Sequence, residues 1–228
     1  MTKLFTTITL LGSLLSTSVA QADTVLQELK TLEGGVLTIS LEEPNLVEND
    51  DVKDVGSVLT GVGGVIQMGR DLVALGEELY VLVAKGRPNV TTQYAPISVL
   101  PREGDQAVNV MDMDDWKKPI SRKLSLSYKY LGMTVAKMDY AINFAYGGSY
   151  NGKGAYITGA QIVPSASSSF GVDFDATMSL IGITNHGTRD NPIAGANLQL
   201  KYSIQTLTHA VQRSLNFLIT GQGEITAI

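Results

Sequence analysis

Cysteine is absent from this sequence of 228 residues, and histidine occurs only twice. The first absence excludes disulfide bonds, thiolate nucleophiles and cysteine-based metal sites. It also excludes the lipid anchor that a bacterial lipoprotein carries on a cysteine. No G-x-S-x-G elbow, H-E-x-x-H helix or phosphate-binding loop occurs. The sequence therefore has no motif that predicts a reaction, a metal ion or an organic cofactor, and we expect no enzyme.

Long hydrophobic runs and an excess of positive charge are also missing. The stretch Leu4 to Leu15 holds only 12 residues, too few to span a bilayer, which needs about 20. We therefore expect no transmembrane helix in the mature chain. Residues 55–228 hold 13 acidic and 14 basic side chains, a net charge of +1. This balance offers no basic face of the kind that nucleic-acid binding requires.

The first 22 residues have the features of a secretory signal peptide. Lys3 gives a short basic start, the apolar stretch follows, and Ala20-Gln21-Ala22 matches a cleavage box. The mature chain is expected to begin at Asp23. Export to an oxidising compartment without disulfides favours a bacterial protein, either periplasmic or secreted.

An acidic N-terminal segment follows, at residues 23–53. Counted through Asp54, it has nine acidic and two basic residues, a net charge of −7. A block of like charge is typical of a solvated arm, which is the interpretation we prefer. A shield, a pro-segment, and a loose cation or partner site are the functional alternatives.

Residues 54–86 have apolar side chains at the three-and-four spacing of one helical face. Asp54 suits an N-cap, and Gly86 with Pro88 suits a helix end. Six interior glycines cost on the order of 5 kcal/mol of helix propensity, so packing or another environment has to offset them. We prefer close packing on the rest of the protein; a membrane interface is the alternative. The face concerned would include Val58, Val62, Ile66 and Val73.

Residues 90–228 alternate between apolar and polar side chains with period two. Leu124, Leu126, Tyr128 and Tyr130 share one face, and a turn at Leu131-Gly132 leads into a second alternating run through Tyr146. Further strands are expected at 155–163, 170–180, 194–206, 215–219 and 224–228, with weaker ones at 35–41, 97–100 and 107–111. The fold class is therefore mainly β (α+β): a single domain over 54–228 in which the helix packs on an antiparallel β-sandwich at 90–228.

The polar loop between two of these strands, residues 185–192, is the best candidate binding site. Asn185, His186, Arg189 and Asp190 place donors and acceptors at an exposed tip, which suits recognition. Ordinary turn chemistry, in which Asn185 and Asp190 hold the loop, is the interpretation we prefer. The second histidine, His209, follows a strand pattern and is read as structural.

Two other groups of residues are read as structural. Asp112, Asp114 and Asp115 lack the further ligands of a calcium loop and suit the acidic end of a strand. Trp116 is expected in the core rather than at a membrane interface.

Two function classes remain open. The first is an exported, non-catalytic binding or structural protein whose partner is an unidentified protein, glycan or lipid surface. The second is a membrane-active secreted protein that acts through the helix at 54–86. Over roughly residues 54–228 the layout is similar to that of the actinoporin-like pore-formers, although the single Trp116 does not reproduce their aromatic cluster. The oligomeric state does not follow from the sequence.

Overall fold

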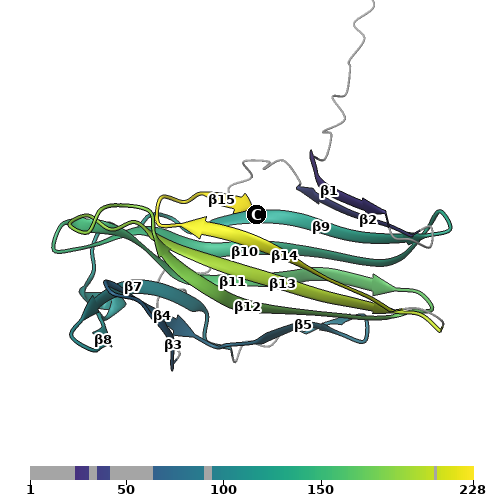
Figure 1. Cartoon of the computed structure of the whole chain (residues 1–228), viewed down its shortest axis with the longest axis horizontal. Coiled ribbons are helices and arrows are strands. Elements are labelled where there is room, and N and C mark those ends of the chain that lie inside the picture. Colours follow the sequence, from purple (N-terminus) through teal and green to yellow (C-terminus); the bar gives the residue numbers. More distant parts are fainter. Residues whose placement is uncertain (1–23, 31–34, 42–63, 90–93, 208–209) are drawn as a thin grey trace, which may run out of the picture.

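The structure is a computed structural model, and it describes residues 24–30, 35–41, 64–89, 94–207 and 210–228. Antiparallel β-strands dominate these ranges, as the sequence predicts, and they form two sheets (Figure 1). In the described part of the chain the one helical element is a short 3-10 turn, η1 (Val110–Asp112). Among these residues, no helix has the length and apolar character needed to cross a membrane.

The larger sheet contains nine strands. Their order is β1 (Thr24–Lys30), β2 (Gly35–Leu41), β9 (Ile120–Tyr130), β10 (Met133–Tyr150), β11 (Lys153–Ser169), β7 (Ile97–Glu103), β4 (Leu72–Gly76) and β3 (Gly64–Met68), and β8 (Gln106–Ala107) pairs with β7. The strand predicted at 35–41 is thus confirmed. The predicted solvated arm is wrong for residues 24–30 and 35–41, because this hairpin adds to the edge of β9.

The smaller sheet contains six strands. Their order is β15 (Ile225–Ala227), β14 (Ala210–Thr220), β13 (Ala194–Gln205), β12 (Asp173–Asn185), β5 (Tyr80–Ala84) and β6 (Arg87–Pro88). Residues that belong to both sheets form one hydrophobic core, so the sheets pack face to face. In β9 the alternation buries Leu124, Leu126 and Tyr128 and leaves the intervening polar residues outside, as predicted. Each large apolar side chain buried in this way contributes about 1.5–3 kcal/mol.

The predicted helix at 54–86 is wrong over residues 64–86, which form β3, β4 and β5. Short apolar runs suit a buried strand as well as a helix, and the glycines that penalise a helix instead separate strands. Lys85 and Gly86, read as a helix end, have φ values of 49° and 71° and form the turn between β5 and β6. The layout similar to the actinoporin-like proteins depended on this helix and is lost with it.

The predicted helical face is lost for the same reason. Ile66 lies half-buried in β3 against the core, and Val73 is buried in β4, so they belong to two paired strands rather than to one helical stripe. Val58 and Val62 lie outside the described residues. His209 also lies outside them.

The β9–β10 hairpin is confirmed, with Tyr130 paired to Met133. Leu131 and Gly132 have φ values of 50° and 79°, the left-handed pair that a tight hairpin turn of type I′ needs. β10 then runs past Gly147-Gly148, which we expected to interrupt it. The ring of Trp116 occupies the space beside Gly148, where a Cβ would lie 2.4 Å from Cζ2. Trp116 is partly buried against the core, so its predicted structural role is confirmed.

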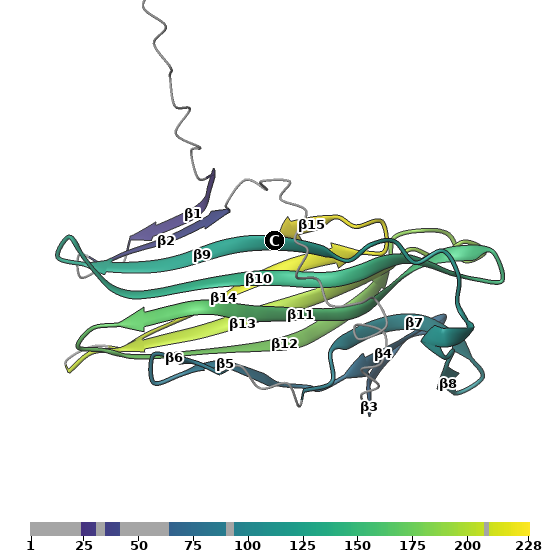
Figure 2. The same cartoon turned by 180° about the vertical axis from the view of Figure 1, so that it is seen from behind.

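The strand directions divide the connections between two ends of the molecule. We call one of them the loop end: it consists of the β5–β6, β9–β10, β11–β12 and β13–β14 connections and lies at the right of Figure 1 and the left of Figure 2. The pairing of Gly35 with Tyr130 places the end of β1 and the start of β2 beside it. The β10–β11 turn, the β12–β13 loop, the β14–β15 turn and η1 lie at the opposite end. Each end therefore combines segments that are far apart in the sequence.

Candidate functional site

The predicted binding loop joins β12 to β13, and Asn185 organises it. Asn185 Oδ1 accepts hydrogen bonds from the backbone N–H groups of Gly187, at 2.8 Å, and Ile193, at 3.0 Å. Its Nδ2 donates to the backbone oxygen of Thr188 at 3.2 Å. The amide is thus occupied in holding the loop, which is the turn chemistry that we preferred.

Asn191, a loop residue that we did not single out from the sequence, fixes the position of this loop. Its Oδ1 accepts from the backbone N–H of Gly154 at 2.7 Å, and its own N–H donates to Thr188 Oγ1 at 3.0 Å. A backbone bond from Ala155 to Pro192 adds a second link to the start of β11. The loop is therefore tied to the neighbouring β10–β11 turn. No local sequence signal reports this tie, because it joins segments distant in the chain.

His186 is exposed and lies over β13. Its Nε2 is 2.8 Å from Thr184 Oγ1, and a Cβ on Gly195 would lie 2.6 Å from the same nitrogen. Arg189 and Asp190 are also exposed, and no described hydrogen bond or ion pair joins them to Asn185 or His186. The four predicted residues thus lie in one exposed loop, but their side chains do not form a common binding site. Their binding role stays a prediction.

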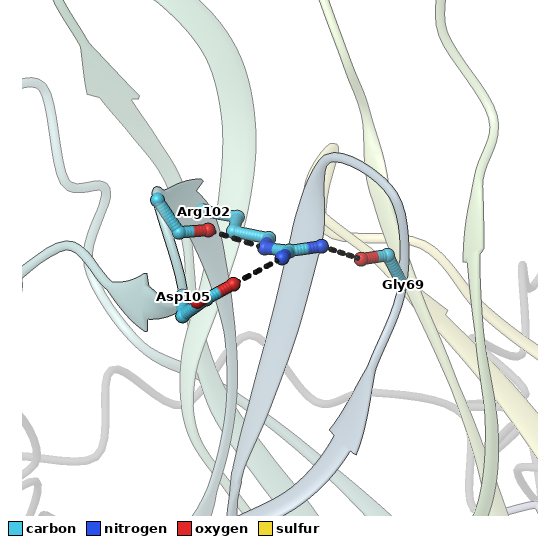
Figure 3. A network of polar contacts seen from close by, with 4 residues as sticks. Gly69, Arg102 and Asp105 are labelled. Atoms are coloured by element: carbon cyan, nitrogen blue, oxygen red, sulfur yellow. Dashed lines mark hydrogen bonds and ion pairs between the residues drawn. The ribbon is translucent and has the colours of Figure 1, made fainter.

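A second polar cluster surrounds Arg102 at the same end of the molecule (Figure 3). The guanidinium donates to the backbone oxygens of Gly104, at 2.6 Å, and Gly69, at 3.2 Å, and to Asp105 Oδ1 at 2.7 Å. These bonds connect the β3–β4 turn with the β7–β8 turn. Three donors of the guanidinium fork are used within the fold, so the cluster is a structural clamp rather than an anion site.

The three aspartates near Trp116 support local structure as well. Asp114 exchanges two backbone hydrogen bonds with Ser149, and Asp115 Oδ2 accepts from Ser149 Oγ at 2.7 Å. Asp112 is the last residue of η1 and Asp114 forms an isolated bridge with Ser149, so these residues do not end the strand predicted at 107–111. Among the described residues, no group of three or more acidic or histidine side chains is arranged to hold a metal ion.

Buried tyrosines lie in the core, and none is poised for proton transfer at neutral pH. Burial raises the pKa of Tyr202 to about 12 and that of Tyr80 to about 12. Burial, followed by the proximity of Tyr202, also raises the pKa of Tyr140. A general acid or base works best with a pKa near the operating pH, so these hydroxyls remain protonated and structural.

The loop end carries large apolar side chains that sequence reasoning missed. Exposed fractions are 72% for Leu131, 63% for Met133, 82% for Phe170 and essentially complete for Leu207. The backbone N–H of Phe170 donates to Val135 at 2.9 Å, which places the β11–β12 connection beside the β9–β10 hairpin. Pairing of Asp173 with Gln205 brings the β13–β14 connection alongside. The available sequence signal was the presence of large apolar residues at turn positions, where polar residues are usual.

Basic side chains surround these apolar residues. Within five residues of the loop-end connections, the described acidic side chains are Asp173 and Asp175, and the described basic ones are Lys85, Arg87, Lys129, Lys137, Lys201 and Arg213. Lys137 forms an ion pair with Asp139, further along β10, at 3.0 Å. The loop end is therefore both apolar and positively charged.

Comparison with known proteins gives no relative: no family model, no curated protein and no solved structure matches this chain.

Proposed function

We propose that this protein is an exported, non-catalytic binding or structural protein of the cell envelope or extracellular space, and that it meets its partner with the loop end. The observation that carries the proposal is the exposure of Leu131, Met133, Phe170 and Leu207 on connections that come from both sheets. Several large apolar side chains exposed on neighbouring connections at one end of a molecule favour a binding surface. Export is supported by the signal-peptide pattern of residues 1–22.

The surroundings of the loop end support this assignment. Long paired strands anchor three of the four connections, as in β10 and β11, whose register extends from Ala136–Ser169 to Tyr150–Lys153. A rigid scaffold that presents side chains on short loops is a common arrangement for recognition. By contrast, the polar atoms of Asn185 and Arg102 at the opposite end are used in internal hydrogen bonds.

Cell fractionation tests the proposal. The full chain is produced in a bacterium, and its distribution between membrane, periplasmic and medium fractions is measured with and without the double substitution Phe170→Ser and Leu207→Ser. We expect the unaltered chain to be exported and to associate with the envelope, and the double variant to be released into the soluble fractions.

The control is the pair Met111→Ser and Ile181→Ser, which removes two exposed apolar side chains away from the loop end. It should distribute like the unaltered chain. Retention of the chain in the cytoplasm, or identical distributions of the loop-end variant and the unaltered chain, would contradict the proposal.

A further inference from the structure

We propose that the partner of the loop end is an anionic lipid surface. This inference rests on the proposed function, because it names what the same end of the molecule binds. Two features decide it: the arrangement of the apolar side chains as separate protruding tips, and the sign of the charge around them.

The apolar side chains have the geometry of insertion rather than of a flat protein interface. Leu131 lies at the tight turn of a two-residue hairpin loop, and Phe170 and Leu207 lie in separate connections. Side chains at protruding tips can enter the boundary between headgroups and acyl chains without any change in the strands below. Tyr130, which is half-buried beside Leu131, has the amphipathic ring that favours this boundary.

The charge at the loop end fits a negatively charged surface. Its six basic side chains stand against Asp173, Asp175 and Asp139, the ion-pair partner of Lys137, and the nearby Glu28 and Lys30 of β1 cancel, so the net charge of these residues is +3. Counted by the same five-residue rule, the opposite end sums to −3, with the acidic set Asp105, Asp112, Asp114, Asp115, Asp190 and Glu224 and the basic set Lys117, Lys153 and Arg189. Such a polarity orients the molecule in the field of an anionic bilayer, with the apolar tips facing the lipid.

Two of the basic residues also lie behind the apolar tips, where they can contact lipid headgroups. Lys129 is two positions before Leu131, and Lys201 pairs with Thr177 and Ser214 and lies four residues before the end of β13. Long basic side chains can bury their alkyl stems and still place the charged group among lipid phosphates. The apolar tips and the lysines would therefore contact successive layers of the same surface.

Vesicle flotation of the purified secreted chain tests the inference. The probes are protein-free vesicles of phosphatidylglycerol with phosphatidylcholine, and of phosphatidylcholine alone. We expect the chain to bind the anionic vesicles, and binding to weaken as salt is raised. Phe170→Ser with Leu207→Ser should reduce binding at least about tenfold. Lys129→Gln with Lys201→Gln should reduce it by about fivefold for each basic residue removed.

The control variant Met111→Ser with Ile181→Ser should bind like the unaltered chain. Circular dichroism and urea unfolding of all variants separate a loss of binding from a loss of folding. Equal binding to neutral and anionic vesicles, no binding by the unaltered chain, or full binding by the Phe170 and Leu207 variant would each overturn the inference.

Fluorescence adds a readout of orientation. Trp116 lies at the opposite end, over Gly148, so its emission should not change when anionic vesicles are added. A Leu207→Trp variant should gain a blue-shifted component on the same vesicles. A shift in Trp116 emission with none from the new tryptophan would overturn the proposed orientation.

Two further outcomes separate this inference from the proposed function. If the chain ignores protein-free vesicles but its envelope association still depends on Phe170 and Leu207, the proposed function stands and the lipid inference is wrong. Dimers in sedimentation velocity that are lost in the same variant, together with absent vesicle binding, would instead assign the loop end to a second copy of the chain and overturn the lipid inference.

Discussion

Tyr140 of β10 and Phe217 of β14 meet edge to face across the two sheets, with ring centroids 6.4 Å apart and an interplanar angle of 63°. This contact fastens the middle of the larger sheet to the smaller one, and such aromatic pairs contribute about 0.5–1.5 kcal/mol beyond the area they bury. The same tyrosine also buries a hydroxyl that has no hydrogen-bond partner among the described residues. The ring of Tyr140 stabilises the folded state, whereas its unpartnered hydroxyl destabilises it.

Replacing Tyr140 with phenylalanine should therefore stabilise the protein. The ring contact with Phe217 is retained, while the cost of an unpartnered buried hydroxyl, about 1–3 kcal/mol, is removed. Urea unfolding should show a higher midpoint with an unchanged slope. Tyr80→Phe is the matched control and should destabilise, because the Tyr80 hydroxyl donates to the backbone oxygen of Ala95 and accepts from the Glu77 amide. A lower midpoint for Tyr140→Phe would contradict this account.

Gly221→Ala should destabilise the fold by about 1–3 kcal/mol, the usual cost of overpacking. A Cβ at this position would lie 2.0 Å from the backbone oxygen of Ala155, which cannot move without disturbing β11. Gly64→Ala is the control, since a Cβ there meets nothing within 4 Å. The midpoint of thermal unfolding should be clearly lower for Gly221→Ala than for Gly64→Ala. Similar midpoints would show that the close approach of Gly221 to Ala155 does not exclude a larger side chain.

Asn185→Ala should loosen the β12–β13 loop with little effect on the core. The backbone amides of Gly187 and Ile193 lose their acceptor, at a cost of about 1 kcal/mol for each hydrogen bond. Hydrogen exchange should accelerate at these two amides and stay unchanged in β13. Arg189→Ala serves as the control, because no described bond holds the loop through that side chain. Unchanged protection at both amides would count against the turn interpretation.

Stability should decline at high pH. Burial raises the pKa of Tyr80 and of Tyr202 from 10 to about 12, so the folded chain holds these protons more tightly than the unfolded chain does. The resulting stabilisation is fully present below pH 10 and is lost as the pH rises from 10 to 12. Urea unfolding across this range should show the decline, and Tyr202→Phe should make it shallower. A decline of equal steepness in that variant would exclude Tyr202 as a contributor.

The alternating segments of this fold were predictable from the sequence, because burial on one side of a strand imposes a period of two. Leu124, Leu126 and Tyr128 face the core as expected, and the left-handed turn at Leu131-Gly132 joins two strands as expected. The segment 64–86 was not predictable in the same way. Its strands are short, and β4 is buried on both faces, as Leu72, Val73 and Ala74 show, so it lacks the alternation that distinguishes a strand from a helix.

The loop end was even harder to predict from the sequence. Leu131, Phe170 and Leu207 are widely separated in the chain, and only the strand order brings their connections to one end. The helical face inferred from Ile66 and Val73 failed because these residues belong to different strands. The loop around His186 could be located from its composition. Its tie to the β10–β11 turn through Asn191 depends on tertiary contacts and could not.

The length of β10 has a mechanical consequence. Eighteen residues at about 3.3 Å each make a strand of roughly 60 Å, and half of its length, residues 136–144, is stiffened by pairing on both sides. If one tip is seated on a bilayer, the tip that carries His186 stands well clear of the headgroups, at a height set by strand length. Shortening the β12–β13 hairpin by paired deletions would lower that height in measured steps.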